Sequence, residues 1–158
     1  MKRLSQETWI RIAMFALIII ILAISVALNA QNWKKGVAVV GYHTLTICLG
    51  AVADAQFDMG NKNLSHTLHA VEIGAVLSGG FIFKPKGTDE ILSYILSYGF
   101  LRFSFFDSFY NMTRDLPLMY NGTTSVYDRT MSKMPDHGKY WVKSCSLIVG
   151  FAIPIKSF

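Results

Sequence analysis

Carboxylate and imidazole side chains stand close together in the middle of this sequence, at spacings that suit shared chemistry. Asp54 and Asp58 are four residues apart, and His66, His69 and Glu72 follow at intervals of three. Residues three or four apart lie on the same face of an α-helix, so each set presents its polar groups along one edge. Such groups are ligands for Zn²⁺, Mn²⁺ or Fe²⁺, and they also act as general acids and bases.

A second group of polar residues follows in an aromatic segment and contains two arginines. A planar guanidinium group can hold an anionic head group or a phosphate. The chemistry that fits both groups is metal-activated hydrolysis of a lipid-linked or phosphorylated substrate. The expected metal ligands are Asp58, His66 and His69; the expected acid–base groups are Asp54, Glu72, Asp107 and Asn111; the expected substrate-binding residues are Arg102 and Arg114.

The pattern Asp54-x-x-x-Asp58 followed by His66-x-x-His69 at the start of an apolar run resembles a family of membrane-bound, metal-dependent hydrolases. That family places a Pro-Asp-x-Asp-His stretch before a His-Arg-Gly-x-x-His-Ser stretch. Here no proline precedes Asp54, no histidine follows Asp58, and no Arg-Gly pair follows His66. The resemblance covers this short stretch only. It implies a metal-dependent hydrolytic site in a membrane protein.

Five apolar segments must position these side chains. The runs predict helices at about 10–30, 37–55, 64–83, 90–113 and 140–156. A bilayer core is spanned by about 17–25 such residues. The first run is longer than the apolar core of a signal peptide, so we expect an uncleaved membrane helix. The last run is short and contains Lys143 and Pro154, so it either spans with strain or lies partly in the interface.

Composition places the chain in a membrane. Hydrophobic residues make up 52% of the sequence, charged residues only 16%, and the mean hydropathy is +0.36. Soluble chains average about 25% charged residues. We therefore predict a single all-α domain, residues 1–158, forming a polytopic bundle of about four or five transmembrane helices. The net charge of +5 is not gathered in a basic patch, which argues against nucleic-acid binding.

Lysine and arginine residues in the loops predict the orientation. With a cytoplasmic N-terminus, nine of them lie on or near the inner side and five lie outside. In an up-and-down bundle, the end of the second helix, the start of the third and the end of the fourth share one membrane side. We expect the polar edges of these helices to face one another there, including two stripes: His43, Ile47, Gly50, Asp54 and Asp58; and Ser93, Ser97, Ser104, Asp107, Asn111 and Arg114.

Non-catalytic interpretations stay open beside the enzyme. Buried polar groups often satisfy one another and specify how helices pack. In that case Glu72 pairs with Arg102 or Arg114, and Asp107 pairs with Arg114. An ion, proton or small-molecule pathway is a further alternative. The expected partners are the lipid bilayer of the inner or plasma membrane, a lipid head group, and a second copy or a larger membrane complex.

Overall fold

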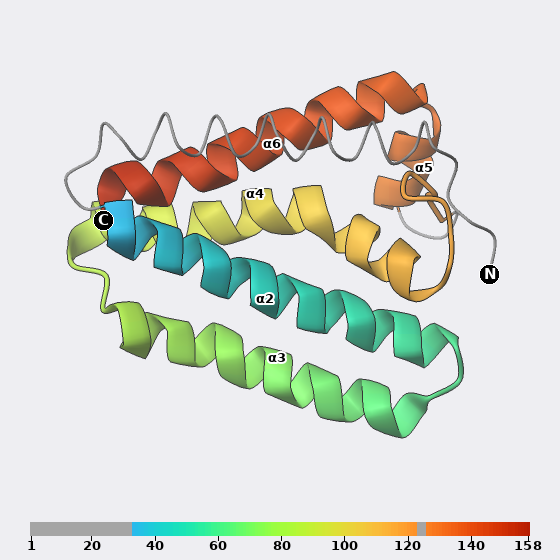
Figure 1. Ribbon diagram of the computed structural model, residues 1–158, viewed down its shortest axis with the longest axis horizontal. Coiled ribbons are helices and arrows are strands. Elements are labelled where there is room, and N and C mark those ends of the chain that lie inside the picture. The colour runs from blue at the N-terminus through green and yellow to red at the C-terminus, as the bar shows by residue number, and fades with distance from the viewer. Residues whose placement is uncertain (1–32, 123–125) are drawn as a thin grey trace.

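The protein is all-helical in a computed structural model that describes residues 33–122 and 126–158 (Figure 1). These residues contain five helices and no strand: α2 (Trp33–Asp58), α3 (Lys62–Phe83), α4 (Gly87–Thr113), α5 (Val126–Ser132) and α6 (Asp136–Ser157). The expected all-α class is confirmed. The helix predicted at about 10–30 lies outside the described residues.

Four long helices run side by side in alternating directions (Figure 1). Helix α2 packs against α3, α4 and α6, and α4 packs closely on α6, whereas α3 has extensive contact with α2 alone. The alternation brings the ends of α2 and α4 together with the starts of α3 and α6, beside the short helix α5 (Figure 1). This end of the bundle is called the α5 end below. It gathers the polar helix ends that the sequence predicted to share one side.

The turns between the helices follow from local backbone chemistry. Gly60 adopts a φ of +88° after α2, and Gly87 adopts +73° where α4 begins. Glycine enters this region without the steric cost that a β-carbon adds. Pro85 follows the last turn of α3 and cannot continue it. The backbone N–H of Lys86 donates to the Glu90 carboxylate at 2.7 Å, which satisfies one donor at the start of α4.

Helices α4 and α6 approach closely through small polar residues. The Ser97 hydroxyl donates to the carbonyl of Gly150 at 2.7 Å, and the Ser104 hydroxyl donates to the carbonyl of Lys143 at 2.9 Å. A side chain at Gly150 would meet Leu101, so glycine permits this approach. Small residues with side-chain-to-backbone hydrogen bonds are typical of helix packing in membranes. The serines of the expected α4 stripe therefore face α6, and not the polar edges of α2 and α3.

Two further expectations need correction. The last helix begins at Asp136, four residues before the predicted Tyr140, and it runs to Ser157. The stretch between the helices predicted at 90–113 and 140–156, for which no helix was predicted, contains the short helix α5. Two of the described helices, α2 and α3, are long and apolar enough to cross a membrane. Helices α4 and α6 do not meet that measure, because serine and charged residues lower their hydropathy.

Candidate functional site

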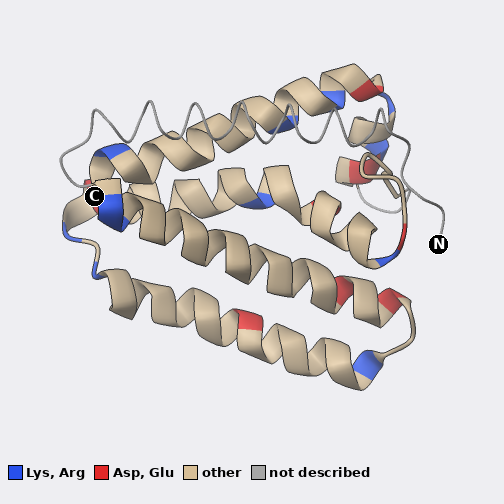
Figure 2. Cartoon of the chain, viewed as in Figure 1, with Lys and Arg blue, Asp and Glu red and all other residues tan. Residues whose placement is uncertain are grey.

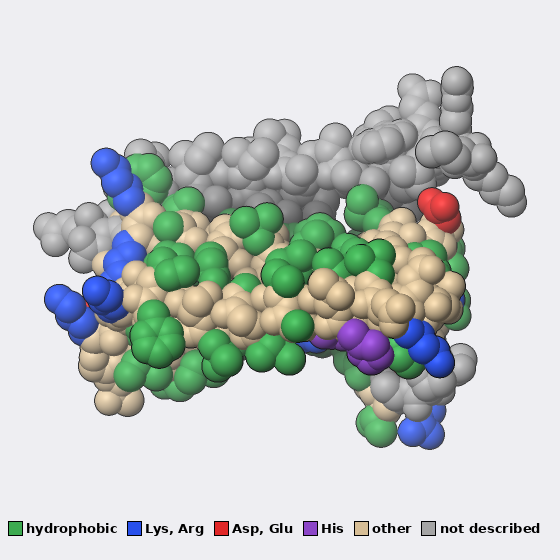
Figure 3. All heavy atoms as spheres, turned by 90° about the horizontal axis from the view of Figure 1, so that it is seen from below, with side chains coloured by type: hydrophobic (Ala, Val, Ile, Leu, Met, Phe, Trp, Pro, Cys, Tyr) green, Lys and Arg blue, Asp and Glu red, His purple; other side chains and the backbone are tan. Residues whose placement is uncertain are grey.

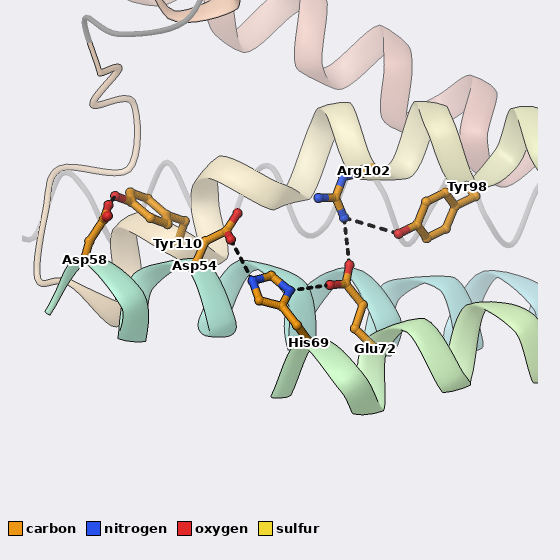
Figure 4. A network of polar contacts seen from close by, with 7 residues as sticks. All are labelled: Asp54, Asp58, His69, Glu72, Tyr98, Arg102 and Tyr110. Atoms are coloured by element: carbon orange, nitrogen blue, oxygen red, sulfur yellow. Dashed lines mark hydrogen bonds and ion pairs between the residues drawn. The ribbon is translucent and has the colours of Figure 1, made fainter. Parts of the chain in front are cut away.

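Four charged or imidazole side chains form a continuous chain of contacts across three helices (Figure 4). His69 on α3 lies at its centre: its Nε2 is 3.0 Å from Asp54 Oδ1 on α2, and its Nδ1 is 3.1 Å from Glu72 Oε2. The other Glu72 oxygen accepts a hydrogen bond from Arg102 of α4 at 3.0 Å. Arg102 also donates to the Tyr98 hydroxyl at 3.2 Å. We call Asp54, His69, Glu72 and Arg102 the α3 network.

A glycine on α2 makes room for the central carboxylate of this network. Glu72 is 8% exposed, and its carboxylate lies where a side chain at Gly50 would be. Glu72 can therefore reach over α2 from α3 to α4, although these two helices have little direct contact. The guanidinium of Arg102 also lies 4.3 Å from the centre of the Phe106 ring, a cation–π distance. The expected pairing of Glu72 with Arg102 is present.

The expected metal ligands do not share a centre. Both ring nitrogens of His69 face carboxylates, which leaves neither directed at a common metal position. The His66 ring lies against Phe57, with ring centres 6.4 Å apart, and Asp58 pairs elsewhere. Within residues 33–122 and 126–158, no group of three His, Cys, Asp or Glu residues is arranged to hold a metal ion.

The end of α2 is joined to the end of α4 by a second small cluster. Arg114 Nη1 lies 3.1 Å from Asp58 Oδ2, and the hydroxyl of Tyr110 donates to the same carboxylate. Arg114 also donates to Tyr110. The cation expected to bind substrate thus already has an anionic partner. The alternative pairing of Arg114 with Asp107 is not seen.

Asp107 faces α6 instead, where it holds two partners. Its Oδ2 lies 2.7 Å from Lys143 Nζ and accepts a hydrogen bond from the Tyr127 hydroxyl of α5 at 2.6 Å. The Lys143 side chain is only 4% exposed. Burial, and then the hydrogen bond to the Asp107 carboxylate, raise the pKa of Tyr127 above its usual value. We call Asp107, Lys143 and Tyr127 the α6 cluster.

Asn111 holds the segment that follows α4 in place by hydrogen bonds. This residue is 1% exposed, and its amide donates to the carbonyls of Leu118 and Tyr120 at 3.1 and 2.9 Å. An amide with both donors engaged by the backbone positions a loop. Among the described residues, Asn111 forms no hydrogen bond with any of the other expected acid–base groups. The structure therefore brings no partner to Asn111 for its expected catalytic role.

Sequence reasoning left two polar residues without a role. In the sequence, Lys143 was interpreted only as a charge in a short apolar run. In the structure it lies one turn from Lys139, on the face of α6 that packs against α4. His43 was placed on the polar stripe of α2; it is 2% exposed, and its Nε2 lies 3.2 Å from the Tyr94 carbonyl. Lys139, Lys143 and Ser146 are four and three residues apart, so they lie on one face of α6, and all three are buried. This spacing is the sequence signal for the buried face.

Comparisons with known proteins add no relative: no family model matches the chain, and no curated protein or solved structure matches it. The hydrolase resemblance therefore depends on its few residues alone. The fold and the site define an all-helical protein with two helices able to cross a membrane and with polar clusters between its helices.

Proposed function

We propose that the protein is a polytopic integral membrane protein whose polar clusters join its helices, acting as a structural or interaction subunit without catalysis of its own. In this proposal α2, α3, α4 and α6 all cross the bilayer, and the N-terminus is cytoplasmic. The observation that carries the proposal is the distribution of side chains: polar groups share the interior with a small apolar core, and many large apolar groups lie on the surface.

The inside of the described bundle is unusually polar. Its fully or nearly buried side chains include Ser97, His43, Asn111 and Lys143. Large apolar side chains point outward instead, and the most exposed are Phe81 at 80%, Val126 at 73%, Trp141 at 71%, Leu45 at 69% and Leu77 at 66%. Water penalises such a surface, because each apolar side chain costs roughly 1.5–3 kcal/mol relative to burial. The penalty is absent where the same apolar side chains contact the hydrocarbon of a lipid bilayer.

The lengths of the helices agree with a bilayer. The four long helices contain 26, 22, 27 and 22 residues. At about 1.5 Å per residue these lengths exceed the roughly 30 Å of a hydrocarbon core. Helices α4 and α6 lie alongside α2, so a membrane that α2 crosses would also contain them (Figure 1). Part of the polarity that lowers their hydropathy lies between them, because Ser97 and Ser104 donate to carbonyls of α6 and Asp107 pairs with Lys143.

The α3 network supports a structural role because its ionic groups already have partners. Glu72 is shared by His69 and Arg102, and Asp54 is bound to the other side of the imidazole. Unpaired charge in hydrocarbon costs about 2.5–3.5 kcal/mol per group on insertion scales. Pairing across three helices offsets that cost and selects one arrangement of α3. Metal-dependent hydrolysis stays a hypothesis, and it would require Asp58, His66 and His69 to move together.

Cysteine accessibility tests the membrane proposal. With Cys48 and Cys145 replaced by serine, single cysteines at Lys62, Leu77 and Lys86 report the two ends and the middle of the bundle. In sealed vesicles, a membrane-impermeant maleimide should label Lys62→Cys and Lys86→Cys from opposite sides and should leave Leu77→Cys unlabelled until detergent is added. Equal labelling of Leu77→Cys and Lys62→Cys in intact vesicles would refute the proposal.

A further inference from the structure

Five lysines from three separate segments gather at the end of the bundle opposite α5. Lys34 and Lys35 lie in the first turn of α2, Lys84 and Lys86 lie in the turn between α3 and α4, and Lys156 lies in the last turn of α6. Figure 2 shows these basic positions together at one end, and Figure 3 shows lysine side chains projecting from it. We call this group the lysine end.

Little negative charge balances the lysine end. The carboxylates there are those of Asp89 and Glu90, in the first turn of α4. Glu90 accepts the backbone N–H of Lys86 and lies 3.7 Å from Lys35 Nζ. Lys35 also lies over the Phe158 ring at 4.6 Å. The four other ammonium groups are exposed and form no ion pair with any residue in the described part of the chain.

The α5 end carries six basic residues, one more than the lysine end, but six acidic residues balance them. Its basic residues are Lys62, Arg114, Arg129, Lys133, Lys139 and Lys143, and its acidic residues are Asp54, Asp58, Asp107, Asp115, Asp128 and Asp136. Arg114, Lys139 and Lys143 each form an ion pair there. The excess positive charge of the described bundle is therefore concentrated at the lysine end.

We propose that the lysine end binds the phosphate groups of anionic phospholipids in the leaflet that surrounds it, which is the outer leaflet when the N-terminus is cytoplasmic. This inference depends on the proposal that the long helices cross a bilayer, since the lysines then lie at head-group depth. A lysine ammonium group is a compact charge on a flexible stem, so it reaches the interface while its methylenes stay in apolar surroundings. Near an anionic surface each such lysine strengthens binding by up to about fivefold.

The spread of the lysines over three segments supports a lipid surface over a soluble anion as the occupant. Lys34, Lys84, Lys86 and Lys156 are exposed, and Figure 3 shows basic side chains projecting outward at this end of the bundle. A leaflet offers many phosphates at one depth, which matches charges spread over α2, the α3–α4 turn and α6. The chemistry is therefore that of a lipid annulus, and a single-ion site is not required.

Spin-labelled lipids test the inference on the full chain in phosphatidylcholine vesicles. The fraction of spin-labelled phosphatidylglycerol held at the protein surface is compared with that of spin-labelled phosphatidylcholine. We expect a preference of about threefold or more for phosphatidylglycerol at low salt. It should disappear in 1 M NaCl, where the screening length falls to about 3 Å. The double variant K84Q/K86Q should lose at least half of the preference.

A matched double variant at the other end provides the control. Lys62 and Lys133 are also exposed, but they lie among acidic residues at the α5 end, so K62Q/K133Q should keep most of the preference. Equal losses in the two double variants, or no preference in the parent, would overturn the inference. Inorganic phosphate that abolishes the preference at constant ionic strength would also overturn it, in favour of a soluble anion. A parent protein that does not enter vesicles at all would instead defeat the proposed membrane function.

Discussion

Two polar clusters on opposite faces of α4 use the same kinds of charge in different surroundings. The α6 cluster pairs Asp107 with Lys143, whose side chain is 4% exposed. The α3 network pairs Glu72 with Arg102, which is 38% exposed, and His69 with Asp54, which is 44% exposed. Removing Lys143 would leave a carboxylate unpaired inside the bundle. Arg102 without Glu72 would keep its contacts with the Tyr98 hydroxyl and the Phe106 ring. The comparison predicts that α4 and α6 are joined rigidly and that α3 is attached more weakly.

The largest expected effect comes from the buried lysine. Lys143→Met should leave the Asp107 carboxylate without its cation and lower the free energy of unfolding by about 3–5 kcal/mol. Unfolding in mixed detergent micelles, followed by circular dichroism, measures this loss. The double variant Lys143→Met/Asp107→Leu should recover much of it, because no charge is then left unpaired. A single variant as stable as the parent would show that the cluster does not join α4 to α6.

The next effect tests the space beneath the α3 network. Gly50→Ala should displace the Glu72 carboxylate and weaken the attachment of α3, at a cost of about 1–3 kcal/mol. Gly41→Ala on the same helix is the matched control, because its added methyl group meets nothing within 4 Å. It should be neutral or stabilising by about 0.5–1 kcal/mol. Equal effects of the two substitutions on unfolding would contradict the bridging role of Glu72.

The α3 network should tolerate change better than the α6 cluster. Glu72→Gln keeps the shape of the side chain but removes its charge from His69 and Arg102. We expect a loss of about 1 kcal/mol, because Arg102 keeps its hydrogen bond to the Tyr98 hydroxyl and its contact with the Phe106 ring. Faster cleavage of the α2–α3 turn by protease, with unchanged cleavage near α5, would locate the loss at α3. A loss as large as that of Lys143→Met would remove the distinction between the two clusters.

Tyr127 makes the attachment of α5 dependent on pH. Its pKa is higher in the folded protein than in the unfolded chain, so its stabilising contribution is complete below the ordinary tyrosine value of about 10. That contribution is lost as pH rises towards the folded value. Tyr127→Phe should cost about 1 kcal/mol at neutral pH and remove this part of the alkaline loss. Tyr120→Phe, at an exposed position, is the control. Phenolate absorbance between pH 8 and 11 follows the titration, and unfolding experiments over the same range measure the stability of the two variants.

Metal chelation should have the smallest effect. His69 already lies between Asp54 and Glu72, so the described geometry supplies no three-residue ligand set for a divalent ion. The melting temperature of the purified protein should stay the same after treatment with EDTA. Elemental analysis should find less than one Zn, Mn or Fe per chain. Stoichiometric metal that is lost in His69→Ala and in Asp58→Asn would instead support the hydrolase hypothesis.

Several features were predictable because they depend on local periodicity. Apolar runs predicted the helical class, and alternation of helices predicted that Asp58 and Arg114 would lie at one end. The pairing of Glu72 with Arg102 was among the alternatives because both lie on polar edges. The partner of Asp107 was not predictable in this way. Lys143 reaches it from another helix, and hydropathy does not say which face of α6 meets α4.

By itself, the sequence determined the helical segments, their alternation and the excess of apolar side chains, since each follows from residue type and spacing along the chain. Tertiary structure decided which polar edges meet: the serines of α4 pack on α6, and Glu72 crosses α2 over Gly50. The position of Lys34, Lys84 and Lys156 at one end, in contrast, already followed from the alternation of the helices along the chain. The physical reason is that helical periodicity orients a side chain only about its own axis, and the order in which helices pack sets its neighbours.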